Sequence, residues 1–586
     1  MRTRENFSMK FMRFSGAGDF KFKIGGFMKK QNKVFLACKI LTAVALGVIS
    51  IFMITIRSNL LDSAMNKGDF FRSLLIFVAV NAAVVIVGIF ENYFSTKRYA
   101  ENESEIMMEL VDKHLSMSVE DLDNSEVKEK FDRAVSGGDF LVDYSESISF
   151  LFKAAVSIFG TLFIFFRIDS KSTLALFIIL TIFAFIEWKS SKKNAEIWVN
   201  YRKNMRRANY FSNVLINPIF SGERKIFNTT DFFKNKFDNS FSDAAKKNES
   251  LGFKRFVRDF SYDFIFMILI LFFIKTFSAG VSNGNISVGT FTSLFYQIVG
   301  LRIVVSEALS RYFKFVNARN KKKSVDEFLE ENTDLDGSKN LQKIDTIEFK
   351  DVHFSYPNST TEVLKGVSFK LERKSYGLVG ENGSGKSTLT KLILGLYRPT
   401  SGKILINGVD ISEYKQDEIK KEMSIVMQNS YHYPATLREN FDFNINSNIN
   451  EHLIKTLKLD EVRDKLKKGY DTNLSQSSKD AVSLSGGEWQ KIAIYRGLNK
   501  NSSLYVLDEP NALLDPVSEA KLYDVYKKEL RDKMSILISH RLGATKEMDE
   551  ILVLKDGKIL HSGSHEELMK TEYYSTIYNT QKEMYL

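Results

Sequence analysis

The nine residues GENGSGKST, at positions 380–388, decide the fold class of the second half of the chain. The apolar run YGLV precedes them and the helical pattern LTKLILGL follows, so the order is strand, glycine-rich loop and helix. Here the glycines let backbone N–H groups surround a phosphate, and the helix N-terminus adds its dipole. The stretch therefore predicts a phosphate-binding loop made of Gly380, Glu381, Asn382, Gly383, Ser384, Gly385, Lys386, Ser387 and Thr388.

Two carboxylates follow a second apolar strand downstream of this loop. The sequence SLYVLDEP, at 503–510, is typical of a buried parallel strand and ends in Asp508 and Glu509. With the phosphate loop it predicts a nucleotide hydrolase, in which Lys386 reaches the β- and γ-phosphates and Ser387 and Asp508 hold Mg²⁺. Glu509 is then placed to orient or deprotonate the attacking water.

Long apolar runs fill the first half of the chain and are close to the 20-residue length that a membrane helix needs. Six runs can be recognised, at 35–56, 71–94, 147–166, 172–188, 263–279 and 290–310. The gaps between them alternate in length, and the two long gaps, 95–146 and 189–262, are highly charged. Because basic residues mark the cytosolic side, both ends and both long gaps are predicted to face the cytosol.

The long gaps have helical periodicity rather than the composition of loops. In SEIMMELVDKHLSMSVEDLD, at 104–123, apolar residues recur at spacings of three and four. Pro218 is the first proline of the chain and the next is Pro357, which fits long helices without breaks. We therefore predict six transmembrane helices that continue far into the cytosol. A soluble all-helical domain is the alternative, and runs this long with few charges argue against it.

The formal net charge of the 586 residues is +11. In a soluble protein this would suggest nucleic-acid binding, but the positive-inside rule explains it here, so we expect no nucleic-acid partner. The basic segment 1–32 is too long for a signal peptide and lacks its cleavage site, so it is predicted to be a cytosolic tail. The single cysteine, Cys38, excludes an internal disulfide.

The sequence LSGGEWQ, at 484–490, lies between the phosphate loop and the two carboxylates, and with it the motif set resembles the nucleotide-binding domain of ABC transporters over roughly 341–586. The resemblance implies a role for each matching residue: an adenine-stacking Tyr356, a Mg²⁺-sensing Gln428, the signature residues Ser485, Gly486, Gly487 and Glu488, a D-loop Asp515 and a switch His540 that contacts the γ-phosphate. Glu509, Gln428 and His540 form the implied catalytic set, and Gln428 joins the implied metal ligands.

The predicted membrane half, with its two long intracellular loops, resembles the membrane domain of ABC exporters. In that family each long loop carries a coupling helix, which would lie near 118–126 and 213–223 here. The implied architecture is a polytopic α-helical membrane domain followed by an α/β P-loop NTPase domain of ABC type. Its expected parts are the tail at 1–32, the six-helix domain at 33–322, a linker at 323–340 and the nucleotide-binding domain at 341–586.

The signature residues predict a second anion site, because Ser485 and the glycine N–H groups open a helix. In the family this site binds the γ-phosphate of ATP held by the other subunit. The chain has one phosphate loop and one signature, so the resemblance implies a second ABC half-transporter, most simply another copy of this chain. A pair formed with a different chain is the alternative.

Two positions depart from the family pattern. Glu488 replaces the usual glutamine of the signature and adds negative charge near the predicted anion site. Ala512 in the D-loop sequence ALLD lacks the usual hydroxyl, so communication between the two sites is expected to be weaker. Neither change removes a catalytic group, and we expect an active ATPase.

The cargo is the least specified part of the prediction. LSGGEWQKIA and SGERKIFN (221–228) resemble exporters of small ribosomal peptides, including lantibiotics and bacteriocins. We expect ATP-driven export of a peptide or other amphipathic substrate across the bacterial cytoplasmic membrane. Multidrug or lipid export, uptake through the exporter fold, and a soluble ABC ATPase acting on ribosomes or DNA are the alternatives.

Several polar residues in or beside the apolar runs are candidates for substrate contact: the ionisable ones because charge inside a membrane is costly, and Ser293 and Gln297 because they lie one turn apart on the sixth predicted helix and could line a cavity. They are Glu91, Lys153, Ser293, Gln297, Arg302 and Glu307. The alternative for the ionisable ones is that they lie at helix ends or in the cytosolic extensions.

Overall fold

The computed structural model of the chain describes residues 30–584 apart from 66–67, 169, 285, 332–336, 358, 429, 444–448, 475–481, 483, 511–515 and 540–541. The chain folds into two compact units. The first comprises the described residues up to Asp112 together with Lys130–Glu330, and the second comprises Lys113–Glu129 and the chain from Glu331 onward. Nearly all of the basic tail predicted at 1–32 lies outside the described residues.

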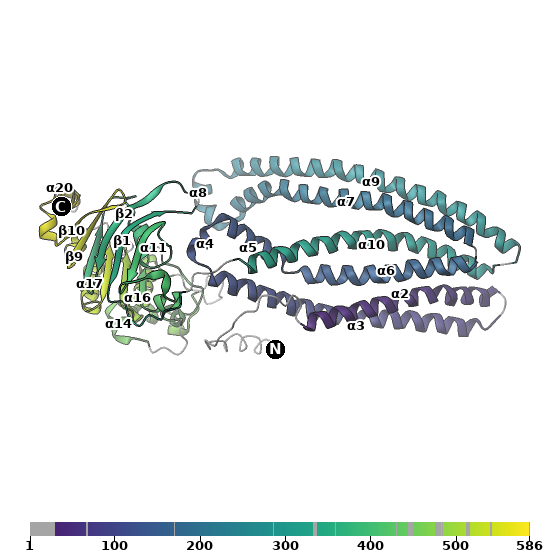
Figure 1. The fold of residues 1–586 in the computed structure, drawn as a ribbon, viewed down its shortest axis with the longest axis horizontal. Coiled ribbons are helices and arrows are strands. Elements are labelled where there is room, and N and C mark those ends of the chain that lie inside the picture. The colour runs from purple at the N-terminus through teal and green to yellow at the C-terminus, as the bar shows by residue number, and fades with distance from the viewer. Residues whose placement is uncertain are drawn as a thin grey trace. The chain divides into compact units, whose positions relative to one another are not determined.

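Long helices dominate the first unit (Figure 1). They are α2 (Lys30–Met65), α3 (Phe70–Ser116), α6 (Phe140–Ile168), α7 (Ser170–Ile216), α9 (Thr230–Ser282) and α10 (Val288–Leu329). The shorter elements between them are α4 (Val119–Asp123), α5 (Ser125–Gly137), the 3-10 helix η1 (Pro218–Phe220) and α8 (Ser221–Ile226). Pro218 stands at the first position of η1, where proline is tolerated because the missing N–H has no partner in a helix.

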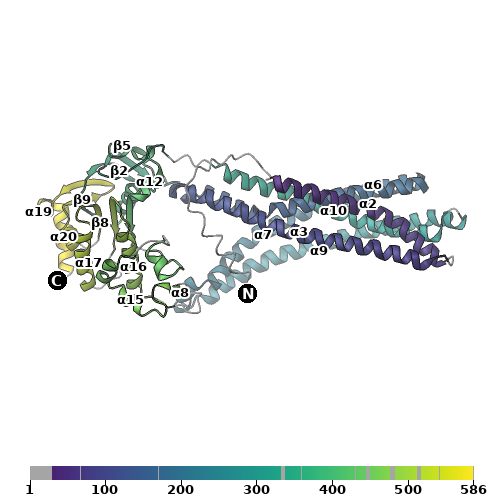
Figure 2. The same ribbon diagram turned by 90° about the horizontal axis from the view of Figure 1, so that it is seen from below.

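The helices of the first unit pack through a shared apolar core. Helix α2 packs against α6 and α10. Helix α7 packs along α9, as Figures 1 and 2 both show. Phe165 of α6, Leu176 of α7, Phe277 of α9 and Leu294 of α10 are buried in one cluster. This packing brings together segments that are more than 100 residues apart in the sequence.

Membrane-spanning capacity can be judged from length and composition. Among the described residues, four helices are long and apolar enough to cross a membrane: Asn32–Met65, Phe70–Ser116, Phe140–Ile168 and Val288–Leu329. They contain four of the six predicted runs. The other two runs, 172–188 and 263–279, lie within the continuous helices α7 and α9, so the count of six spans stays a prediction.

Helix α10 continues to Leu329, so the first part of the stretch 323–340 predicted to be a linker is helical, and the boundary between the two units falls within this stretch, after Glu330. The polar composition of this stretch is that of a solvated helix face. Lys322 pairs with Asp326 at 3.0 Å and Lys323 with Glu327 at 3.4 Å, both at the i, i+4 spacing that stabilises a helix. Helix α4 lies within 118–126, where the first coupling helix was expected, and η1 with the first residues of α8 lies within 213–223, where the second was expected.

Two sheets form the framework of the second unit. The smaller sheet is mainly antiparallel and has the order β2-β1-β4-β5, built from β1 (Ile347–Ser355), β2 (Glu362–Leu371), β4 (Ser401–Ile406) and β5 (Val409–Asp410). The larger sheet has the order β10-β9-β3-β8-β7-β6 and is parallel except for β10. Its strands are β3 (Ser375–Val379), β6 (Met423–Val426), β7 (Leu504–Asp508), β8 (Met534–Ile538), β9 (Glu550–Lys555) and β10 (Lys558–Gly563).

Helices cover the larger sheet and form a second lobe beside it (Figure 2). The helices used below are α11 (Lys386–Ile393), α13 (Leu437–Phe441), α16 (Gly486–Asn499) and α17 (Pro516–Glu529). The others are η2 (Ile411–Glu413), α12 (Gln416–Lys421), α14 (Glu451–Thr456), α15 (Asp460–Asp464), η3 (Gly469–Asp471), α18 (Leu542–Thr545), α19 (His565–Leu568) and α20 (Glu572–Met584). The strands β3, β7 and β8 are almost entirely buried, and for β7 this agrees with the buried parallel strand predicted from SLYVLDEP.

Helix α4 belongs to the second unit, although the sequence placed it in the membrane domain at 33–322. The Tyr397 hydroxyl donates a hydrogen bond to the Asp123 carboxylate, and the backbone N–H of Arg398 donates to Glu120 at 3.2 Å. Burial and the Asp123 carboxylate both raise the pKa of Tyr397 well above its usual range. The first long loop is thus anchored by hydrogen bonds just after α11.

Candidate functional site

The glycine-rich stretch forms a loop between β3 and α11 that only glycine permits at several positions. Gly383 and Gly385 have φ values of +82° and +105°, in the left-handed region. A Cβ at Gly380 would lie 2.3 Å from the carbonyl oxygen of Leu554. Strand, loop and helix thus follow one another as the sequence predicted.

Lys386 is the first residue of α11, and its side chain folds back over the loop. Its Nζ donates hydrogen bonds to the carbonyl oxygens of Gly380 at 2.8 Å and Glu381 at 2.9 Å. Burial lowers the pKa of Lys386, while the carboxylates of Glu509 and Asp508 act in the opposite direction. The ammonium group is therefore held at the loop and lies within the field of both carboxylates.

Glu509 and Gln428 meet, although 81 positions separate them in the sequence. The Gln428 side chain donates to the Glu509 carboxylate through a hydrogen bond of 2.6 Å. Glu509 has a φ of +45°, which is uncommon for a residue with a side chain, and its N–H bonds the Ile538 carbonyl at 2.9 Å. A strained backbone at the end of β7 thus fixes the carboxylate predicted to be the base.

Tyr356, the residue predicted to stack on adenine, lies beside the phosphate loop. Its hydroxyl lies 3.0 Å from the Thr388 hydroxyl, and its ring makes an edge-to-face contact with Tyr397. The Lys391 ammonium lies 5.1 Å from the centre of the same ring. These contacts hold the ring at the start of α11.

The signature stretch opens α16. Ser485 is the N-cap, with φ −67° and ψ 159°, and Gly486 and Gly487 are the first residues of the helix. Glu488 completes a capping box with Ser485. Asp515 and His540, the remaining predicted site residues, lie outside the described residues, as does Ala512.

The phosphate loop also fits a nucleotide in its unused polar groups. Ser384 Oγ is buried and has no hydrogen-bond partner among the described residues. The first N–H groups of α11 have no acceptor within the helix, because an α-helix leaves its first turn unsatisfied. Ser387 is exposed at the same helix end. A phosphate and its cation would supply acceptors and charge at this place.

Two further side chains contact these motifs, and the sequence motifs assign a role to neither. Gln490, which is 1% exposed, donates from Nε2 to the Pro510 carbonyl at 2.9 Å, so α16 is tied to the residue after Glu509. Lys465 lies 2.9 Å from the Glu488 carboxylate. Gln490 stands inside the quoted stretch LSGGEWQ, but Lys465 lies in a different segment and carried no sequence signal.

Two of the six candidate polar residues of the first unit pair with side chains of neighbouring helices, and a third pairs within its own helix. Gln297 donates to the Thr161 hydroxyl at 3.0 Å, Arg302 pairs with Asp263, and Glu307 pairs with Arg311 at 2.7 Å. Ser293 is fully buried, and its hydroxyl has no hydrogen-bond partner among the described residues. These pairs are interhelical contacts or, for Glu307, a contact within α10, and they do not by themselves define a substrate site.

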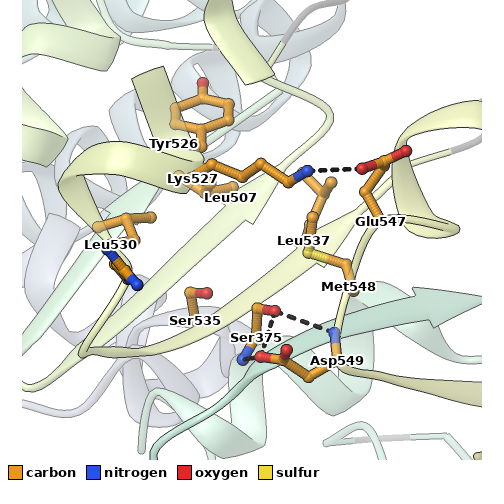
Figure 3. Close-up of a pocket in the computed structure, with 11 residues that line it drawn as sticks. Ser375, Leu507, Tyr526, Lys527, Leu530, Ser535, Leu537, Glu547, Met548 and Asp549 are labelled. Atoms are coloured by element: carbon orange, nitrogen blue, oxygen red, sulfur yellow. Dashed lines mark hydrogen bonds and ion pairs between the residues drawn. The ribbon is translucent and has the colours of Figure 1, made fainter. Parts of the chain in front are cut away.

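The second unit also contains a cavity of about 160 Å³ away from the phosphate loop (Figure 3). It lies between α17, β8 and the segment before β9, with Leu507, Leu530 and Leu537 among its apolar lining. Lys527 pairs with Glu547 at 2.6 Å, and Asp549 accepts hydrogen bonds from the N–H and hydroxyl of Ser375 at 2.8 and 2.7 Å. These polar contacts satisfy one another, so the cavity is bounded by structural bonds.

Comparisons with known proteins agree with this geometry. The ABC transporter family model matches residues 364–512. The subtilin transport ATP-binding protein SpaT of Bacillus subtilis is 30% identical over 398 residues, which cover 66% of this chain and 63% of that protein. The nisin transport ATP-binding protein NisT of Lactococcus lactis subsp. lactis is 26% identical over 586 residues, covering 95% and 94%.

Similarity extends to a lipid flippase and to a solved exporter structure. The ATP-dependent lipid A-core flippase of Haemophilus ducreyi is 30% identical over 358 residues, 59% of this chain and 61% of that protein. A bacterial Atm1-family ABC exporter with ATP bound superposes with a TM-score of 0.76 and 20% identity, covering 94% of this chain and 98% of that one. At this identity the superposition shows the fold.

The second half of the chain contains an ABC transporter ATP-binding domain, and the whole chain has the fold of an ABC exporter, in which a helical domain with apolar helices precedes that domain. The predicted fold class is confirmed for this arrangement.

Proposed function

We propose that this chain is one half of an ATP-driven exporter in the bacterial cytoplasmic membrane and that it works as a pair of identical chains. Its ABC domain lies in the cytoplasm and hydrolyses ATP with Mg²⁺. The observation that carries the proposal is the 2.6 Å hydrogen bond between Gln428 and Glu509, in a domain that also holds the Lys386 loop. A membrane domain on the same chain gives that hydrolysis a transport step to drive.

Different residues of the site would contact the adenine, the phosphates and the Mg²⁺ ion. Tyr356 supports the adenine, and Lys386 leaves its two carbonyl partners to reach the phosphates. Ser387, Asp508 and Gln428 would hold Mg²⁺, which supplies charge neutralisation at the γ-phosphate when bound. Glu509 accepts a proton from the attacking water while Gln428 orients its carboxylate. His540 and Asp515 complete the set by their motif positions.

Two exposed apolar surfaces support a second copy. The segment around η1 and α8 in the first unit exposes Ile216, Ile219, Ile226 and Phe227, all at 71% or more. The segments on both sides of α13 in the second unit expose Met427, Tyr431 and Phe443, at 50% or more. Exposed clusters of this kind mark interaction sites. In a pair of chains, the segment around η1 and α8 of one chain would cover the exposed residues beside α13 of its partner.

The cargo we propose is a peptide or another amphipathic molecule. The names of the subtilin and nisin transport proteins support a peptide, and the nisin protein aligns over nearly its whole length. Lipid export is the second candidate, because the lipid A-core flippases are also similar. Binding of ATP would favour the closed pair of ABC domains, and hydrolysis would allow the pair to separate. A transport cavity between the membrane domains would then open alternately to the two sides of the membrane.

The test is ATP turnover of the chain alone, reconstituted in lipid, with Glu509→Gln as the blank. We expect turnover above the blank and saturable stimulation by amphipathic peptides. Stimulation by lipids alone would favour the flippase alternative. Turnover no higher than that of Glu509→Gln would overturn the pair of identical chains and require a second, different chain.

A further inference from the structure

The N-terminus of α16 is capped by the side chain of Glu488, a residue in the first turn of the same helix. The Oε2 atom of Glu488 accepts hydrogen bonds from the Ser485 N–H at 2.8 Å and from the Ser485 hydroxyl at 2.9 Å. The Glu488 N–H in turn donates to Ser485 Oγ at 3.3 Å. The only proton of the Ser485 hydroxyl is therefore donated to Glu488 and cannot be donated to a bound phosphate at the same time.

The second oxygen of the same carboxylate has a cationic partner. Lys465 Nζ lies 2.9 Å from Glu488 Oε1. The Glu488 side chain is 18% exposed, whereas that of Lys465 is 63% exposed. Partial burial of the Glu488 carboxyl favours its neutral form, but Lys465 and Ser485 outweigh this and lower its pKa. The carboxylate is therefore charged at neutral pH, and Lys465 balances that charge.

We propose that Lys465 and Glu488 form a positioning pair that sets the affinity of the signature site for the γ-phosphate of the partner's ATP. Glu488 holds the Ser485 hydroxyl and opposes an incoming anion. Lys465 offsets this opposition by neutralising Glu488. The inference rests on the proposed function, because it requires that the signature residues meet ATP across a pair of chains.

The two side chains act in opposite directions, and this makes the pair testable. Removing the charge of Glu488 leaves an amide that still accepts from the Ser485 N–H, since glutamine also forms a capping box. The Ser485 hydroxyl is then released more easily from residue 488, and the repulsion between residue 488 and the incoming γ-phosphate is removed. Removing the charge of Lys465 leaves the carboxylate unbalanced a few bonds from the anion site. The effect of Lys465 must therefore depend on the presence of Glu488.

The experiment is a double-mutant cycle on nucleotide binding in the full-length chain. All variants carry Glu509→Gln to prevent turnover and are reconstituted in lipid nanodiscs that hold two chains. The measured quantity is the concentration of radiolabelled ATP, with Mg²⁺, at half-saturation. We expect Glu488→Gln to lower this concentration about threefold, and Lys465→Met to raise it about threefold, the size of an exposed ion-pair effect.

The coupling between the two positions decides the outcome. In the Glu488→Gln background, Lys465→Met is expected to change half-saturation by less than about 1.5-fold. An equal effect of Lys465→Met in both backgrounds would overturn the proposal, as would an unchanged half-saturation in Glu488→Gln.

Salt and a conservative variant separate positioning from simple loss of structure. Lys465→Arg keeps the charge and is expected to restore the wild-type value. The Lys465→Met effect should shrink as the salt concentration rises from about 0.05 to 0.5 M, because the pair is partly exposed. Lys370→Met, which breaks an exposed ion pair at 2.8 Å between Lys370 at the end of β2 and Glu372 just after it, is the matched control and should leave ATP binding unchanged.

Failure of this inference is distinguishable from failure of the proposed function. The cycle measures binding without turnover, and the proposed function is judged by the turnover of the chain without Glu509→Gln. Active turnover with no coupling in the cycle would remove the positioning pair alone. Single-chain nanodiscs that show the same half-saturation shifts would place the effect within one chain and also overturn the proposal.

Discussion

Helices α11 and α16 both have glycine at or next to their first position and both present N–H groups that attract an anion, yet the residues around the two helix ends differ. At α11 the residue before the helix is Gly385, which has no side chain to cap it, and the first residue is the cation Lys386. At α16 the cap is Ser485, and Glu488 bonds back to it. One helix end is left open by its backbone, and the other is occupied by a carboxylate of its own chain.

The difference shows that a helix N-terminus alone does not make a strong anion site. The dipole contribution is at most about 1 kcal/mol at a surface position, so the groups around the helix end decide the affinity. At α11 the loop glycines and Lys386 add to the dipole. At α16 Glu488 acts against it, and Lys465 reduces that opposition.

The largest effect is expected at the carboxylate that serves the α11 site. Glu509→Gln removes the base but keeps an acceptor for Gln428, so ATP turnover should fall about 10²- to 10⁴-fold with little change in ATP affinity. The measurement is phosphate release in proteoliposomes. Glu372→Gln, which removes an exposed carboxylate just after β2, should retain normal turnover. Equal turnover in the two variants would disprove the assignment of the base.

A crowded loop should close the α11 site as Glu488 closes the α16 site. Gly380→Ala places a methyl group 2.3 Å from the Leu554 carbonyl, which the backbone cannot accommodate. We expect ATP half-saturation to rise tenfold or more, because the loop must shift away from its phosphate-binding shape. Gly88→Ala is the control, since the new Cβ would have no neighbour within 4 Å. Unchanged ATP binding in Gly380→Ala would contradict the tight loop.

Opening the α16 cap should cost stability. Ser485→Ala removes the hydroxyl that accepts from the Glu488 N–H, and loss of an N-cap costs about 1 kcal/mol. We expect a lower unfolding temperature of the full chain in detergent and weaker ATP binding in the Glu509→Gln background. Ser485→Thr should recover most of the stability. A Ser485→Ala chain that unfolds at the wild-type temperature would show that the cap contributes nothing.

A contact remote from both helix ends provides a control that should change the stability of the chain but not its ATP binding. Asp549→Ala removes the acceptor for two hydrogen bonds from Ser375 (Figure 3), and each such bond contributes about 1 kcal/mol or less at an exposed site. The unfolding temperature should fall, while ATP half-saturation stays constant. A changed ATP half-saturation would mean that the start of β3 communicates with the loop at its end.

The smallest effect concerns the acid limb of stability. Because Lys465 and Ser485 lower the pKa of Glu488, its ionised form stabilises the folded chain at neutral pH. This contribution is present above the unfolded-state pKa and is lost as the pH falls through the folded-state value. Glu488→Gln should therefore lose less stability than the wild type between about pH 6 and pH 3. Parallel melting-temperature curves over this range would contradict it.

The architecture and most of the nucleotide site could be predicted because they depend on local patterns. The glycine-rich loop at 380–388 needs positive φ values and small residues, and the nine residues of the loop alone reveal both requirements. The apolar runs predicted helices because length and composition decide membrane insertion. Glu509 and Gln428 were identified by motif, and the fold brings them together at 2.6 Å.

The tertiary structure alone decided which distant residues act on those motifs. Lys465 reaches Glu488 from another segment, Gln490 ties α16 to Pro510, and Tyr397 holds Asp123 of the first long loop. Local sequence encodes backbone preference and apolar periodicity, but an ion pair or a buried hydrogen bond between segments depends on packing that no short window contains. The sequence by itself therefore determined the two anion-attracting helix ends, and only the folded chain decided that one is open and the other is held closed.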